Sequence, residues 1–123
     1  MALPRRSSRV IVVDDVRYRW MSDLPDDMLR KQDRVVSFIV QRDDGPGAKL
    51  RASVRWAPVV VAYRDVGKVV SHRFDRVPPF VVAQTIRLAI RDGWSSSKAG
   101  PEYDAGFVEG RVDWSELASV DDE

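Results

Sequence analysis

The sequence contains no cysteine and only one histidine, His72. Without cysteine the chain cannot use a catalytic thiolate, a thiolate zinc site or a disulfide scaffold. A zinc site would need ligands besides one histidine, and the spacing of the carboxylates supports none. As a general base, His72 would need a nucleophile, but Ser71 is its neighbour on an expected strand, where adjacent side chains face opposite ways. We therefore expect a partly exposed structural histidine and no metal or other cofactor.

The sequence also lacks a long hydrophobic run and a strong net charge. No segment reaches the roughly 20 apolar residues of a membrane-spanning helix, and the N-terminal region lacks the apolar stretch of a secretory signal. The 20 basic and 19 acidic residues nearly cancel, so the molecule as a whole has no field that would attract nucleic acid or an anionic membrane. We expect a soluble, cytoplasmic protein in which any electrostatic function is local.

Phosphate-binding and calcium-binding loops are absent as well. Residues 43–49, DDGPGAK, lack the Gly-Lys-Ser/Thr ending of a P-loop, and they join two expected strands. Adjacent aspartates occur at 14–15, 26–27, 43–44 and 121–122. Each pair lies at an expected turn, a helix start or the chain end, where aspartate hydrogen-bonds to the local backbone. We interpret these aspartates as turn and terminal residues rather than as metal ligands.

The 123 residues fit a single domain with its own hydrophobic core. Three pairs of β-branched or aromatic runs are each separated by turn-forming residues, which predicts three hairpins. The expected strands cover residues 9–13 and 16–20, 34–42 and 48–56, and 59–64 and 68–74. Residues 21–33 are expected to form a connection that holds one short helical turn.

Residues 78–92 predict the main helix. On a wheel of 100° per residue, the apolar residues fill one arc, and Gln84, Arg87 and Arg91 fill the opposite one. The two prolines at 78 and 79 suit the first turn of a helix, where their missing N–H groups would be unpaired anyway.

Gly93 and Trp94 follow this helix directly. Gly93 can adopt the left-handed conformation that ends a helix, and Trp94 would then fold back onto Ala89 or Ile90. The alternative is a functional tryptophan at the rim of a pocket or stacked on a base.

The remaining residues predict a loop over 95–101, a last short strand around Phe107 and a short helix at Trp114. The fold class is then α+β, an antiparallel meander of about five to seven strands with one main amphipathic helix on one face. We expect a flexible N-terminus at residues 1–8, a single domain at 9–117 and an acidic disordered tail at 118–123.

Basic residues alternate with apolar ones on the expected strands and would share the face opposite the helix. This candidate face for an anionic partner consists of Arg17, Arg19, Lys49, Arg51, Arg55 and Arg73. If the strands adjoin, such a face can bind phosphates. Tyr18 and Trp20 belong to the other face, however, so stacking aromatics are missing. The alternative is a solvated face whose arginines pair with aspartates.

Because catalytic constellations are missing, the sequence favours a non-enzymatic binding or accessory domain that contacts another protein or a second copy of itself. The alternative function is a nucleic-acid-binding module that uses the basic face. An enzyme whose site is assembled from distant, ordinary residues is a third possibility, because no pattern in one sequence would show it.

Overall fold

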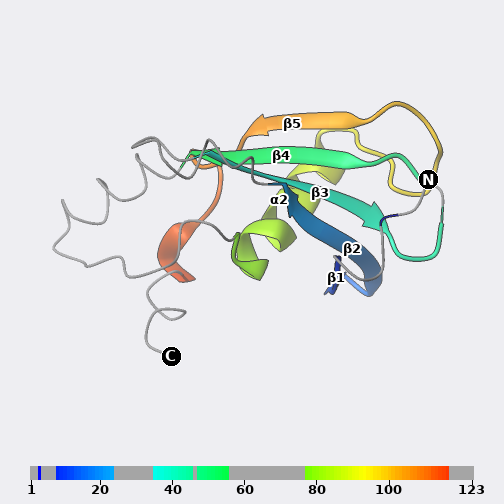
Figure 1. Ribbon diagram of the computed structural model, residues 1–123, viewed down its shortest axis with the longest axis horizontal. Helices are drawn as coiled ribbons and strands as arrows, with labels where there is room; N and C mark the ends of the chain where they lie inside the picture. The colour runs from blue at the N-terminus through cyan, green and yellow to red at the C-terminus, as the bar shows by residue number, and fades with distance from the viewer. Residues whose placement is uncertain (1–2, 4–7, 24–34, 46, 56–76, 117–123) are drawn as a thin grey trace, which may run out of the picture.

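The computed structural model describes residue 3 and residues 8–23, 35–45, 47–55 and 77–116. In this part of the chain, a five-stranded sheet has one α-helix packed against one of its faces (Figure 1). The elements are β1 (Arg9–Val13), β2 (Val16–Asp23), β3 (Val35–Arg42), β4 (Leu50–Arg55), α2 (Pro79–Arg91), β5 (Tyr103–Phe107) and the 3-10 helix η2 (Trp114–Glu116). The expected α+β class is confirmed.

The strand order is β1-β2-β3-β4-β5, with β1 and β5 at the two edges (Figure 1). The first four strands are antiparallel neighbours, as expected for a meander. β5 instead runs parallel to β4, so the expectation of a purely antiparallel sheet is wrong for this strand. The reason is that α2 lies between β4 and β5 in the chain, and a parallel pair needs such a crossover connection.

The first hairpin turns at Asp14 and Asp15, as the sequence predicts. Both residues have positive φ angles, 51° and 68°, the conformation of the type I′ turn that matches the twist of a hairpin. β2 then continues to Asp23, because Met21 lies opposite Ile39 on β3. Residues 21–23, which were expected to begin a connection, therefore belong to β2. The third expected hairpin, at 59–64 and 68–74, lies outside the described residues, as does the tail at 118–123.

The core forms between α2 and the sheet face that it covers. Every second residue of β3 and β4 is fully buried, which is the period of a strand that presents one face to a core. The fully buried residues of these strands are Val36, Phe38, Val40, Leu50, Ala52 and Val54. Tyr18 and Trp20 on β2 are also buried, whereas Arg17 and Arg19 point away, so the predicted parity of this strand is confirmed.

The helix ends as the sequence predicts. Gly93 has φ +118°, and its N–H donates to the Ile90 carbonyl at 3.2 Å, while the Trp94 N–H donates to the Ala89 carbonyl at 2.8 Å. This pair of bonds is the Schellman motif. The Trp94 side chain is buried, so this residue stops the helix and does not present its ring to a ligand.

The Trp94 ring makes two contacts that the sequence did not predict. Its centroid lies 6.0 Å from that of Tyr18, and its Nε1–H donates to the Ala48 carbonyl at 3.1 Å. Ile90, one of the two expected partners, remains 46% exposed. The ring thus ties the end of α2 to the sheet, because the fold brings residue 48 beside residue 94.

The loop after α2 and the turn between β3 and β4 hold each other in place. The Ala48 N–H donates to the Lys98 carbonyl at 2.8 Å. On the other side of this turn, Gln41 is buried; its amide nitrogen donates to the Gly47 carbonyl at 2.9 Å, and its amide oxygen accepts from the Leu3 N–H at 3.2 Å. These bonds give the β3–β4 turn a structural role.

Candidate functional site

The basic residues predicted to form one face lie in two groups. Five of the six belong to the described part of the chain, and Arg73 lies outside it. Arg17 and Arg19 are on β2, and Lys49, Arg51 and Arg55 are on or directly before β4. β3 separates these strands and places Gln41 opposite Arg19 and Ile39 opposite Arg51. The structure therefore brings the members of each group together but keeps the two groups apart.

The group on β2 has its own counter-charge. The Asp43 carboxylate, in the turn after β3, lies 2.6 Å from the Arg19 Nε and 3.6 Å from the Arg17 Nε. The side chains of Arg19 and Asp43 are only 15% and 18% exposed, so water screens this pair less than a surface pair. Arg17, at 62% exposed, remains the more accessible of the two arginines.

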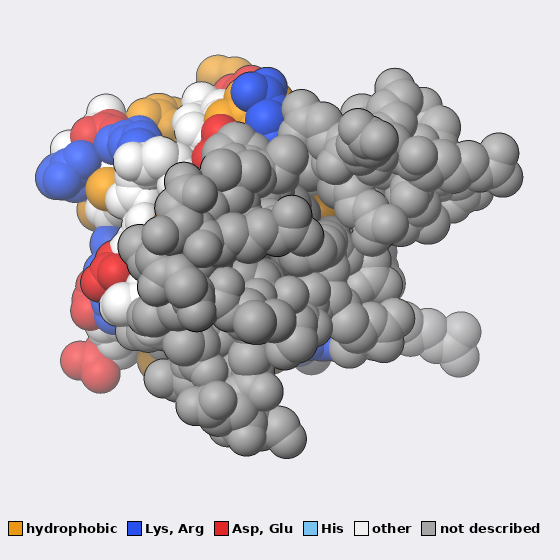
Figure 2. Space-filling view, turned by 90° about the vertical axis from the view of Figure 1, so that its left-hand side faces the viewer, with side chains coloured by type: hydrophobic (Ala, Val, Ile, Leu, Met, Phe, Trp, Pro, Cys, Tyr) orange, Lys and Arg blue, Asp and Glu red, His pale blue; other side chains and the backbone are white. Residues whose placement is uncertain are grey.

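The group on β4 is also engaged with neighbouring side chains. The Arg51 Nε lies 3.1 Å from a Glu102 oxygen, and the Arg55 guanidinium lies 4.4 Å from the centre of the Phe107 ring. Figure 2 shows acidic side chains next to basic ones on the face that it presents. Asp43 and Glu102 therefore offset part of the positive charge on this face.

Asp92, at the end of α2, is held in its charged form by a salt bridge. The Arg111 Nη2 lies 2.6 Å from an Asp92 oxygen, and this hydrogen bond, together with the charges of Arg111 and Arg91, lowers the pKa of Asp92 below 3.8. A carboxyl whose pKa is lowered by folding stabilises the fold above its unfolded pKa, and this contribution is lost as the pH falls through the folded value.

Replacing Arg111 with glutamine should raise the pKa of Asp92 toward 3.8, because the main cause of the shift is removed. An NMR titration of the carboxyl carbons would measure the change. Asp113 serves as an internal control, since hydrogen bonds from Ser115 lower its pKa and the substitution should not affect it. An unchanged pKa for Asp92 would show that the salt bridge does not form in solution.

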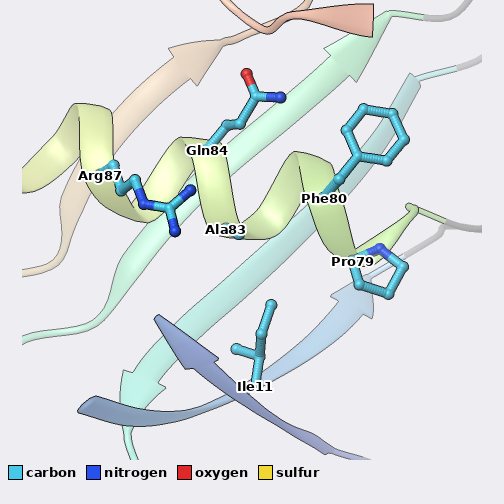
Figure 3. Close-up of a pocket in the computed structure, with 6 residues that line it drawn as sticks. All are labelled: Ile11, Pro79, Phe80, Ala83, Gln84 and Arg87. Atoms are coloured by element: carbon cyan, nitrogen blue, oxygen red, sulfur yellow. The ribbon is translucent and has the colours of Figure 1, made fainter. Parts of the chain in front are cut away.

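A hollow of about 280 Å³ lies between β1 and α2 (Figure 3). Its lining consists of Ile11, Pro79, Phe80, Ala83, Gln84 and Arg87. Figure 3 shows Ile11 on the β1 side and the other five residues on α2. Most of this lining is apolar, so the hollow can accept a hydrophobic group.

The polar lining residues are already held by the fold. The Gln84 amide exchanges two hydrogen bonds with the Asp113 backbone, at 3.0 Å and 2.7 Å. The Arg87 Nε lies 3.3 Å from an Asp14 oxygen, and both side chains are more than half exposed. Among the described residues that line the hollow, Arg87 is the only titratable one. The lining therefore offers mainly an apolar contact surface.

The aspartate pairs and His72, for which the sequence predicts no metal or catalytic role, lie only partly within the described residues. No three histidine or acidic side chains of the described residues gather as ligands for a metal ion. The aspartates at 14–15 and 43–44 lie in turns, as interpreted from the sequence. His72 and the aspartates at 26–27 and 121–122 lie outside the described residues. In the same part of the chain, no helix is long and apolar enough to cross a bilayer.

Exposed hydrophobic side chains lie on the edge strand β1 and on the neighbouring flank of α2. Val10 and Val12, on the face of β1 that points away from α2, are 40% and 60% exposed. Ile90 is 46% exposed and follows Ala83 by seven residues, so it lies on the flank of α2 that lines the hollow. Together, Val10, Ile11, Val12, Ala83 and Ile90 are called the β1 edge patch below.

Reasoning from the sequence did not identify this patch. The sequence feature that could have indicated it is the run VIVV at residues 10–13, which places apolar residues on both faces of a strand. Such a run is typical of a strand covered on both faces, yet the structure places it at the edge of the sheet.

Comparison of the chain with models of protein families, with curated proteins and with solved structures finds no match.

Proposed function

We propose that this protein is a small non-enzymatic domain that binds another protein chain through the β1 edge patch. The observation that carries the proposal is the gathering of exposed apolar side chains there. Of the four large hydrophobic residues that are exposed in the described part of the chain, Val10, Val12 and Ile90 belong to this patch. Exposed apolar side chains along an edge strand mark a protein contact more often than an anion site.

The backbone of β1 supports the same function. Val13 and Val16 close a hairpin with a two-residue turn and exchange hydrogen bonds. The alternation along the strand then turns the backbone groups of Val10 and Val12 away from β2. Among the described strands, β1 pairs only with β2, so a strand of a partner can pair with its outer side.

Replacing Val12 with lysine should weaken the contact while leaving the fold intact, because the side chain is largely exposed and a lysine disfavours pairing at a strand edge. The measurement is a nuclease-treated pull-down with tagged protein, followed by a binding titration with the purified partner. We expect the substitution to weaken binding about fivefold or more, since one cross-strand pair contributes up to about 1 kcal/mol and the lysine also disfavours pairing at the edge.

Phe107→Lys is the matched control for this experiment. Phe107 is 47% exposed, like the valines, but lies on β5 at the other edge of the sheet. Its replacement should leave binding unchanged. Equal loss in both variants, or in neither, would contradict the proposed contact surface.

Nucleic-acid binding is the second candidate, and the exposure of Arg17 is the observation in its favour. The double variant Arg17→Glu, Arg51→Glu tests it, because the two substitutions change one arginine in each of the two basic groups. If the basic face bound phosphates, this variant would reduce the salt dependence of binding by about two counterions. We expect no such change. A weaker, less salt-dependent complex with single-stranded or duplex oligonucleotides would establish the second candidate instead.

A further inference from the structure

We infer that the chain that binds the β1 edge patch is a second copy of this protein, and that the two β1 strands pair antiparallel about a twofold axis at Ile11. This inference rests on the proposed function and specifies its partner. The paired sheets would form one continuous sheet of ten described strands, five from each copy.

The strand is complementary to itself in one register. Centred on Ile11, antiparallel pairing places Val10 opposite Val12 of the second copy, and all five residues of Arg9–Val13 find a partner. Val10 and Val12 are also the two residues whose backbone groups point outward. Each Val10–Val12 pair can therefore exchange two hydrogen bonds, and the symmetry produces this pair twice.

The side chains agree with this register. On the face away from α2, the exposed valines of one copy cover those of the other, and cross-strand pairs of β-branched residues stabilise a sheet. Arg9 lies opposite Val13 of the second copy, so no like charges face each other directly.

The charges at the two ends of the strand are complementary. β1 begins at Arg9 and is followed by the turn residues Asp14 and Asp15, both exposed. Antiparallel pairing brings the Arg9 of each copy next to the acidic turn of the other. An arginine side chain is long enough to reach a carboxylate one or two residues beyond its opposite partner. Because the axis repeats the contact, this attraction forms twice and favours a second copy over a partner without a matching charge pattern.

The helices contribute to the same contact. A twofold axis between antiparallel edge strands is perpendicular to the sheet, so both α2 helices lie on one side of the continuous sheet. The flank with Ala83 and Ile90 then faces the second copy, and the two Ile11 side chains meet beside their hollows. A stable dimer buries about 800 Å² on each copy, more than five edge residues supply alone. We therefore expect the α2 flanks to be part of the interface and the dimer to dissociate on dilution.

The first test is sedimentation velocity of the purified full chain over a wide concentration range. We expect a monomer–dimer equilibrium that Val12→Lys shifts toward the monomer by at least about tenfold, and that Phe107→Lys leaves unchanged. Far-UV circular dichroism would verify that both variants are folded.

The second test exploits the absence of natural cysteine. At the axis, the two copies of residue 11 form a non-hydrogen-bonded pair with Cα atoms about 4.5 Å apart, which fits a disulfide. The two copies of residue 12 are offset by two positions along the strands, too far apart for the same bond. Oxidation by diamide, which takes up the two electrons and two protons that the two thiols release, should therefore cross-link Ile11→Cys much faster than Val12→Cys.

The outcomes separate this inference from the proposed function. A monomer at every concentration, a dimer that Val12→Lys does not affect, or faster cross-linking at residue 12 than at residue 11 would overturn the self-pairing. If the chain is monomeric and a different protein binds in a manner that Val12→Lys disrupts, the proposed function remains and the self-pairing is wrong. A dimer lost in Val12→Lys, kept in Phe107→Lys and cross-linked at residue 11 would support both.

Discussion

Replacing Trp94 with alanine should lower the free energy of unfolding by about 3–5 kcal/mol, the range typical of large aromatic residues deleted from a core. Trp94 is 4% exposed, and its ring packs against the ring of Tyr18. The substitution would leave a cavity between α2 and the sheet. It would also remove the donor to the Ala48 carbonyl. Because a domain of this size is stable by only about 5–15 kcal/mol, this is a large fraction of the total.

Urea denaturation followed by far-UV circular dichroism would measure the loss without depending on the tryptophan signal. Trp94→Phe is the matched control, since it keeps an aromatic ring near Tyr18 and removes only the indole N–H and part of the volume. We expect it to cost about 1–3 kcal/mol. A loss below about 1 kcal/mol for the alanine variant would mean that the ring does not lie in the core, and would revive a functional role for it.

Replacing Gly47 with alanine should cost about 3 kcal/mol, the upper end of the range for overpacking. A Cβ at this position would lie 1.7 Å from the Ser96 carbonyl oxygen. This atom belongs to the backbone of the loop after α2, so no side-chain rotation can relieve the clash. The loop would have to move, and the hydrogen bond between Ala48 and Lys98 would be strained with it.

Gly45 provides the control in the same turn. A Cβ at Gly45 meets nothing within 4 Å, so Gly45→Ala should change the stability by less than about 0.5 kcal/mol. The same urea titration compares the two variants. If they lose equal stability, the close approach of the loop to the β3–β4 turn does not exist in solution.

These two substitutions separate stability from binding. Trp94 and Gly47 hold the loop after α2 against the start of β4, whereas the β1 edge patch lies on the outer strand and on the flank of α2 beside it (Figure 1). A variant that loses stability but still dimerises in its folded state would show that the two regions act independently. Val12→Lys should have the opposite effect, because Val12 contributes little to the core.

Only part of the candidate site could be predicted from the sequence. The alternation in residues 16–20 and 50–55 correctly assigns the arginines to the face away from the core. The carboxylates that pair with these arginines could not be predicted from the sequence, because Asp43 is 24 residues from Arg19 and Glu102 is 51 residues from Arg51. Only the turn after β3 and the crossover to β5 bring these carboxylates close.

By itself, the sequence determined the local elements. Each local feature depends on residues a few positions apart, so its physical cause is present in a short stretch of chain. These features are the alternation in the strands, the Asp-Asp turn, the two prolines at the start of α2 and the Gly-Trp pair at its end. Other features depend on which distant surfaces meet. They are the strand order, the parallel pairing of β5, the burial of Trp94 against Tyr18 and the exposure of β1. Tertiary structure alone decided these, because the free energy of burying a side chain depends on the neighbour that covers it. The run VIVV is equally compatible with a central strand and with an edge strand. Its position at the edge of the sheet, beside β2 and α2, makes it the surface that we propose for binding.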